Sequence, residues 1–168
     1  LDYFIDAFGT SKIPSKKHFL LTASSIDLSN GHFILTDENH ETAKSVDFTR
    51  LHILVSNFKV YGPEVYANIQ KMSFLDHRGL YVKSLKGNYS FTQQHMILDK
   101  MEIQTKESSI KGYAALNYMI EDFSDFQNKV EFDVKIKSAR LASNDIRCFY
   151  NELGKHQYFK LRSHITGP

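Results

Sequence analysis

Alternation between apolar and polar residues dominates the middle of the chain. Residues 130–136 are apolar at every even position and charged at every odd position between them. This period of two is typical of a β-strand with one covered face. The same period recurs over residues 110–116 and 101–105. The pattern predicts an all-β fold.

Two longer alternating stretches change phase part-way along. In the first, the apolar positions Val65 and Ile69 are followed by Met72 rather than by an odd-numbered position. In the second, Phe48 is followed by Leu51. An extra residue in one strand produces such a shift and bends the strand, as in a β-bulge. Two bulged strands therefore predict a strongly curved sheet.

Turn-forming residues separate the alternating stretches. Asn30-Gly31 is the strongest short-range hairpin signal in the chain. Further polar turns are expected at residues 37–40, 76–79, 92–94 and 106–108. Because short loops join neighbouring strands antiparallel, we expect a mainly antiparallel meander of about eight or nine strands. Such a sheet forms either a taco-like β-groove or a partly open sandwich.

Two stretches follow helical rather than strand spacing, and they predict short amphipathic helices. The pattern near the C-terminus has Ser143 or Asn144 as a helix N-cap and Gly154 as a stop. The apolar residues of the two patterns match at an offset of 145: Leu1, Phe4, Ile5 and Phe8, followed by Gly9, and Ile146, Phe149, Tyr150 and Leu153. Either this is coincidence, or one helix-plus-sheet unit covers about 1–142 and the next begins at about 143–168.

Composition and charge narrow the class of protein. The chain of 168 residues is 42% hydrophobic and 13% aromatic, which excludes general disorder. Its net charge of +2 supplies no long-range field, so we expect no nucleic-acid partner. No apolar stretch is long enough for a spanning helix. Since the chain starts at Leu1 rather than Met, we expect a single β-rich segment of a longer protein, whose membrane anchor lies elsewhere.

Residues that could carry chemistry are few and scattered, and no phosphate-binding loop, zinc-protease or nucleophile motif is present. The only cysteine, Cys148, lies in an amphipathic pattern that predicts a partly buried, inert thiol. Glu121, Asp122 and Asp125 form one acidic cluster in the longest loop, and a hydrolase would require a raised carboxyl pKa there. The histidines are dispersed, at His18, His32, His40, His52, His77, His95, His156 and His164. We expect no enzyme activity, no metal and no cofactor.

The apolar positions of the alternating strands are the candidate functional residues. If the sheet stays open, they line a groove without polar groups, which suits acyl chains. If the sheet closes, they form the core of a structural or adhesive β-sandwich. The predicted lining residues are Val65, Ala67, Ile69, Met101, Ile103, Ile110, Ala114, Leu116, Val130, Phe132, Val134 and Ile136.

Residues 23–37 (ASSIDLSNGHFILTD) and the stretch 79–118, including LYVKSLKGNYSF and MILDKMEIQTKESSIKGYAALNY, carry a family resemblance. They resemble the β-repeats of TamB and AsmA-like envelope proteins, in particular the TamB-like proteins of Bacteroidetes-type bacteria. The resemblance covers about two-thirds of the chain.

The resemblance implies a periplasmic β-groove whose parent protein is anchored in the inner membrane of a Gram-negative bacterium. It also implies phospholipid transport to the outer membrane, or assembly of that membrane, with acyl chains as the ligand. A barrel protein of the outer-membrane assembly type would bind another part of the parent chain.

Overall fold

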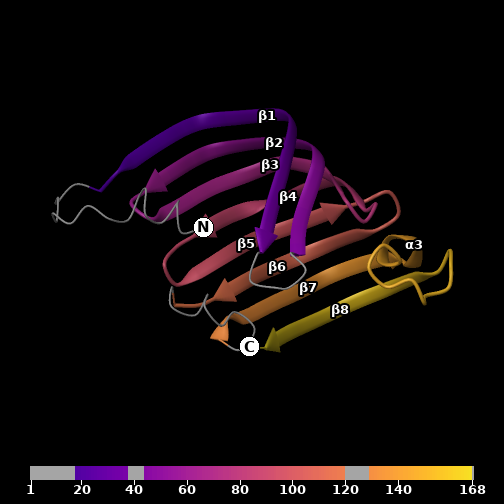
Figure 1. Ribbon diagram of the computed structural model, residues 1–168. Helices are drawn as coiled ribbons and strands as arrows, with labels where there is room; N and C mark the ends of the chain where they lie inside the picture. The colour runs from indigo at the N-terminus through magenta and orange to yellow at the C-terminus, as the bar shows by residue number, and fades with distance from the viewer. Residues whose placement is uncertain (1–17, 38–43, 120–128, 168) are drawn as a thin grey trace.

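Eight β-strands in a single antiparallel sheet form nearly all of the regular structure in the computed structural model, which describes residues 18–37, 44–119 and 129–167. Each strand pairs with the next in the chain, so the order across the sheet is β1 to β8 (Figure 1). The strands are β1 Leu20–Asp37, β2 Lys44–Tyr61, β3 Glu64–Asp76, β4 Tyr81–Phe91, β5 His95–Gln104, β6 Ser109–Asn117, β7 Glu131–Ala142 and β8 Tyr158–Gly167. The predicted all-β, antiparallel meander is confirmed, and the sheet does not close on itself.

Bulges bend the sheet where the sequence changes phase. The register of β2 against β3 shifts between Thr49 and His52, next to Arg50, whose φ is 51°. The register of β3 against β4 shifts between Ile69 and Met72. Both positions confirm the two predicted bulges. In Figure 1, β1 and β2 turn sharply part-way along, and their bent ends cross in front of the other strands.

The Asn30-Gly31 pair does not form the predicted hairpin turn. It lies inside β1, which continues to pair with β2 on both sides of it. Asn30 has a φ of 56°, the left-handed conformation that this sequence favours. The conformation inserts a bulge in β1, opposite Leu51, instead of reversing the chain. The prediction of a two-residue hairpin here was therefore wrong.

The remaining turns are tight. The expected turns at 76–79, 92–94 and 106–108 connect β3 to β4, β4 to β5 and β5 to β6, and the one at 37–40 falls largely outside the described residues. A turn that the strand pattern did not predict, Gly62-Pro63, connects β2 to β3. Gly62 has a φ of 56°, and Tyr61 pairs directly with Glu64.

The predicted amphipathic helix at residues 144–153 is absent. Only one helical turn, α3 (Ser143–Ile146), forms between β7 and β8. Phe149 and Tyr150, from the apolar side of the pattern, are each 53% exposed, so they bury too little apolar surface to stabilise a longer helix. Neither proposed cap acts as one, because the Ser143 hydroxyl instead accepts the Gln157 backbone N–H at 3.0 Å. The corresponding N-terminal stretch lies outside the described residues.

A buried polar cluster holds α3 against the turn between β5 and β6. The Asp145 carboxylate accepts hydrogen bonds from the hydroxyls of Thr105 and Ser108, each at 2.5 Å. Ser108 also accepts the Ala142 backbone N–H at 2.9 Å. These bonds hold the first turn of the connection in place, while the rest of it returns to pair Tyr158 with Ala142.

The described residues form a single layer. The chain exposes 12059 Å², whereas a compact monomer of this mass would expose roughly 8,500 Å². All strands of the described residues belong to one sheet, so no second sheet from this part of the chain adds to its burial.

Candidate functional site

The strand register divides the sheet into two faces of opposite character. Directly paired residues on neighbouring strands point to the same side, so the pairing can be followed from β1 to β8. On one side nearly every position is apolar on all eight strands. We call this side the apolar face. Its largest members include Leu28, Phe33, Phe48, Val55, Ile69, Met72, Phe74, Leu85, Phe91, Leu98, Met101, Leu116, Phe132, Ile136, Leu161 and Ile165.

The structure brings the predicted lining residues onto this face. The strand pairing can be followed from β3 across β4, β5 and β6 to β7. It places all the predicted lining residues that lie in strands on the same side of the sheet. Val130 lies just before β7 and is 3% exposed. Those in strands are Val65, Ala67, Ile69, Met101, Ile103, Ile110, Ala114, Leu116, Phe132, Val134 and Ile136. Their placement on one side follows from the alternation, whereas their contact with a ligand stays a prediction.

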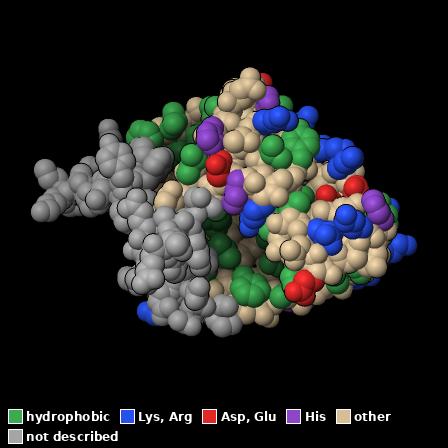
Figure 2. Space-filling view, turned by 45° about the vertical axis from the view of Figure 1, so that its right-hand side comes forward, with side chains coloured by type: hydrophobic (Ala, Val, Ile, Leu, Met, Phe, Trp, Pro, Cys, Tyr) green, Lys and Arg blue, Asp and Glu red, His purple; other side chains and the backbone are tan. Residues whose placement is uncertain are grey.

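The side chains of the apolar face are more exposed at the edges of the sheet than in its middle. Ala67 and Met101, in central strands, are 7% and 8% exposed. Phe33 in β1 and Ile165 in β8 are 45% and 43% exposed. Figure 2 shows a hollow in the molecule with hydrophobic side chains along its visible wall. Contiguous exposed apolar surface of this kind marks an interaction site rather than ordinary solvent-facing surface.

Aromatic contacts pack the bent ends of β1 and β2 on the apolar side. The Phe33 and Phe48 ring centroids are 6.1 Å apart, and those of Phe48 and Phe74 are 4.3 Å apart. This row connects β1, β2 and β3 just beyond the bulges. The bend is therefore stabilised by apolar packing as well as by backbone conformation.

Tyr118 lies directly after β6 and is a polar group that the apolar side accommodates. Its side chain is 5% exposed, and its hydroxyl donates a hydrogen bond to the Thr92 carbonyl at 3.0 Å. Burial, together with the nearby Tyr89, raises the pKa of Tyr118 to about 12. The phenol therefore stays neutral at ordinary pH. Among the described residues, no buried side-chain nitrogen or oxygen lacks a hydrogen-bond partner.

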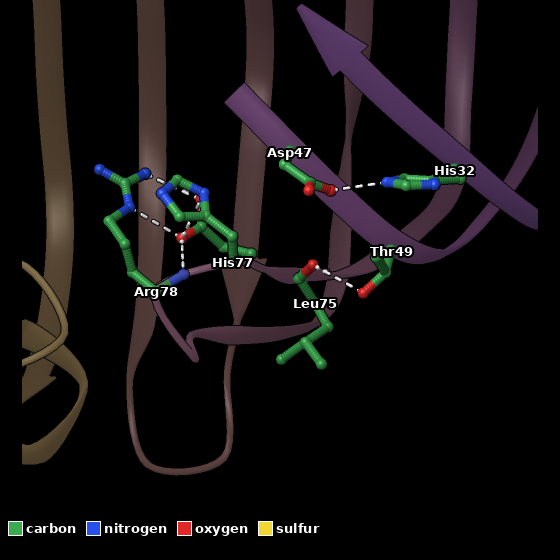
Figure 3. Close-up of polar contacts among 7 residues, drawn as sticks. His32, Asp47, Thr49, Leu75, His77 and Arg78 are labelled. Carbon is green, nitrogen blue, oxygen red and sulfur yellow. Dashed lines mark hydrogen bonds and ion pairs between the residues drawn. The ribbon is translucent and has the colours of Figure 1, made fainter. Parts of the chain in front are cut away.

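The opposite face is mainly polar and carries exposed ion pairs. Lys111 and Glu102 approach to 2.8 Å, and Asp133 contacts both Lys135 at 3.2 Å and His164 at 2.7 Å. Near the bend, the His32 imidazole lies 2.8 Å from an Asp47 carboxylate oxygen (Figure 3). Exposed pairs of this kind contribute little to stability. They show that this face is in contact with water.

The Asp76 carboxyl group has a strongly lowered pKa, and its hydrogen bonds explain why. Asp76 ends β3 with 3% of its side chain exposed, and it accepts hydrogen bonds from the Arg78 backbone N–H and guanidinium, each at 2.8 Å (Figure 3). The Arg78 guanidinium lowers the pKa of Asp76 to about 2. The Arg78 side chain also covers the Phe149 ring at 4.2 Å. The carboxylate is thus committed to closing the turn between β3 and β4.

The residues that could carry chemistry remain dispersed in the described part of the chain. Within residues 18–37, 44–119 and 129–167, no three His, Cys, Asp or Glu side chains come together as a metal site. Cys148 is a free, partly buried thiol. The acidic cluster of Glu121, Asp122 and Asp125 lies outside the described residues. The expectation that the chain has no enzyme activity and needs no cofactor stays a prediction.

Comparison with known proteins leaves the family open. The chain matches no protein-family model, no curated protein and no solved structure. Across the described part of the chain, no helix has the length and apolarity needed to cross a bilayer. The resemblance to TamB and AsmA-like proteins therefore remains a prediction, and the function proposed below rests on the geometry of the sheet.

Proposed function

We propose that this chain is a non-enzymatic segment of an envelope-spanning β-groove protein, and that its apolar face holds the acyl chains of phospholipids. The observation that carries the proposal is the apolar face itself, which runs across all eight strands of an open sheet. In this proposal the bends in β1 and β2 curve the sheet into a taco-like groove around the lipid.

The chemistry of the face favours acyl chains over other ligands. Burial of a methylene group contributes about 0.8 kcal/mol without any directional bond. A long hydrocarbon chain therefore gains affinity from area, and a face of Val, Ile, Leu, Met and Phe side chains supplies that area. The buried polar groups Tyr118 and Asp76 at this side already have hydrogen-bond partners in Thr92 and Arg78, so a ligand needs no polar group to pair with them.

The two edges of the sheet are consistent with a segment of a longer groove. Within the described residues, β1 and β8 each pair with a strand on one side only. Further strands of a parent chain can extend the sheet from either edge, since an unpaired edge presents free backbone donors and acceptors. In this proposal the parent protein spans the periplasm of a Gram-negative bacterium, has its anchor in the inner membrane and partners an outer-membrane barrel protein through another region. Its role is phospholipid transport to, or assembly of, the outer membrane.

The alternative, a structural or adhesive β-sandwich, requires a second sheet over the apolar face. The described residues contribute all their strands to one sheet. A closed core would thus depend on layers that this part of the chain does not supply.

Native mass spectrometry with lipid extraction tests the proposal. The chain is purified from a bacterial host as wild type, as an Ala114→Glu/Val134→Glu variant, and as a Thr22→Glu/Lys59→Glu control. Each variant changes a register pair. The first pair lies on the apolar face, and the second lies on the polar face, because Lys59 also pairs with Tyr66, which alternates with the apolar-face residues Val65 and Ala67. We expect phospholipid to co-purify with the wild type and the control and to be absent from the apolar-face variant.

Circular dichroism shows whether each variant remains folded. A lipid-free wild-type protein that unfolds cooperatively would support a closed module instead. Equal lipid loading of a folded apolar-face variant would also contradict the proposal.

A further inference from the structure

A cationic hollow lies on the polar face, on the side of the sheet opposite the apolar face. Its volume is about 600 Å³, and it is lined by parts of β6, β7 and β8. Five cationic side chains from the described residues line it, and no described carboxylate does: the cations are Lys111, Lys137, Arg140, Lys160 and Arg162. Because the net charge of the whole chain is only +2, this concentration of charge is local.

A bulge in β7 creates the hollow. The register of β7 shifts between Ile136 and Ala139 relative to β8, and it also shifts near Lys111 relative to β6. The extra residue turns the Lys137 carbonyl out of the ladder, where the Arg162 guanidinium donates a hydrogen bond to it at 3.1 Å. The guanidinium is thereby held in position at the rim.

The cations of the hollow are only partly neutralised by the protein. Lys111 pairs with Glu102 at 2.8 Å, beyond the lining of the hollow. Arg140 donates to the Glu107 backbone carbonyl at 3.3 Å rather than to a carboxylate, and it stacks on the Tyr158 ring at 3.9 Å. Lys137 and Lys160 form no ion pair with any described residue.

The arrangement also carries an unfavourable pair. Arg140 and Lys160 are direct register partners on neighbouring strands, where like charges oppose each other. A bound anion would relieve this repulsion. The size of the hollow falls within the range of small-molecule sites and exceeds what a single carboxylate fills. Guanidinium and ammonium groups together are the side chains that bind phosphate groups.

We propose that the hollow between β6, β7 and β8 binds a ligand with two or more phosphate groups. A soluble diphosphate and the phosphorylated headgroup of a lipid share this chemistry. The inference is independent of the acyl-chain proposal, because the five cations of the hollow lie on the polar face and none of them is a predicted lining residue of the groove.

Titration with two probes tests the inference and separates the two sources. Inorganic pyrophosphate is titrated by calorimetry, and cardiolipin, a lipid with two phosphate groups, is tested by co-sedimentation in phosphatidylcholine vesicles. The variant is Lys137→Gln/Lys160→Gln, which removes two cations without a described ion-pair partner. The control, Lys71→Gln/Lys83→Gln, removes two exposed lysines from β3 and β4, and the wild-type melting temperature confirms that both variants fold.

We expect pyrophosphate to bind the wild type and the control alike, and to bind the Lys137/Lys160 variant about tenfold more weakly or worse. The same loss with vesicles assigns the site to lipid headgroups, and a loss with pyrophosphate alone assigns it to a soluble ligand. Absence of binding by both probes would overturn the inference. Equal weakening in the control, or tighter binding of single-stranded DNA than of either phosphate probe, would overturn it as well.

Discussion

The two faces of this sheet are made by the same strands but differ in what they present. Each strand sends alternate residues to opposite sides, so a single backbone produces both surfaces. One side is apolar from β1 to β8, and its coverage falls toward the edges. The other carries ion pairs and a cationic hollow. The difference teaches that the polar face can be exposed to water at little cost, whereas the apolar face leaves large hydrophobic side chains exposed toward the edges of the sheet.

The largest loss of stability is expected from a substitution at Gly112, where β6 lies against β7 next to the bulge in β7. A Cβ added there would lie 2.1 Å from the Lys135 carbonyl oxygen. Gly112→Ala must therefore push β7 away from β6, and we expect a loss of about 3 kcal/mol or more in the free energy of unfolding.

Urea denaturation followed by circular dichroism measures this loss. The matched control is Gly79→Ala, because a Cβ at Gly79 meets nothing within 4 Å, although its φ is +96°. We expect the control to lose about 1 kcal/mol. If Gly112→Ala proved no more costly than the control, the close approach of the two strands would be wrong.

A pair of neighbours in β2 sharpens the comparison between faces. Val55 belongs to the apolar face and is 8% exposed, whereas the adjacent Leu54 belongs to the polar face and is 39% exposed. Val55→Ala should cost about 1–2 kcal/mol of unfolding free energy, and Leu54→Ala about 0.5 kcal/mol or less. Thermal and urea unfolding of both variants check this. A larger cost at Leu54, the bigger side chain, would reverse the assignment of the faces.

We expect substitution of Asp76 to have a smaller effect on the free energy of unfolding, and this effect should depend on pH. Its pKa is lowered to about 2 in the folded protein from an ordinary value of 3.8. The stabilisation is therefore complete above about pH 4 and is lost as the pH falls toward 2. We expect Asp76→Asn to remove on the order of 1–2 kcal/mol at neutral pH.

Unfolding free energies measured from pH 7 to pH 2 test this prediction. The difference between wild type and Asp76→Asn should shrink across the acidic part of that range. Glu102→Gln, which removes an exposed pair with Lys111, serves as the control and should change stability less. A constant difference between wild type and Asp76→Asn at all pH values would rule out the ionised carboxylate as its source.

The strands and the two faces could be predicted from the sequence because apolar and polar residues alternate along a strand that has one covered side. Both phase shifts marked real bulges, and the strand candidates for the lining fell on one side. The Asn30-Gly31 prediction failed because a left-handed residue suits a bulge as well as a turn. Gly62-Pro63 carried a readable turn signal that was missed.

Other features depend on contacts between residues distant in the chain. The helical spacing at 146–153 was misleading because Phe149 and Tyr150 stay half-exposed, so their burial does not stabilise a longer helix. The cationic hollow combines Lys111 with Lys160, which are 49 positions apart by their numbers, so no local pattern reveals it. The cluster around Asp145 likewise joins Thr105 to the connection after β7.

The most direct test of the central claim is photo-crosslinking with a phospholipid that carries a diazirine in its acyl chain. After irradiation of the lipid-loaded protein, mass spectrometry of peptides locates the modified side chains. The account predicts labels on exposed apolar-face residues such as Phe33 and Ile165, with none on their polar-face neighbours His32 and His164. Labels distributed equally over both faces, or confined to the polar face, would contradict it.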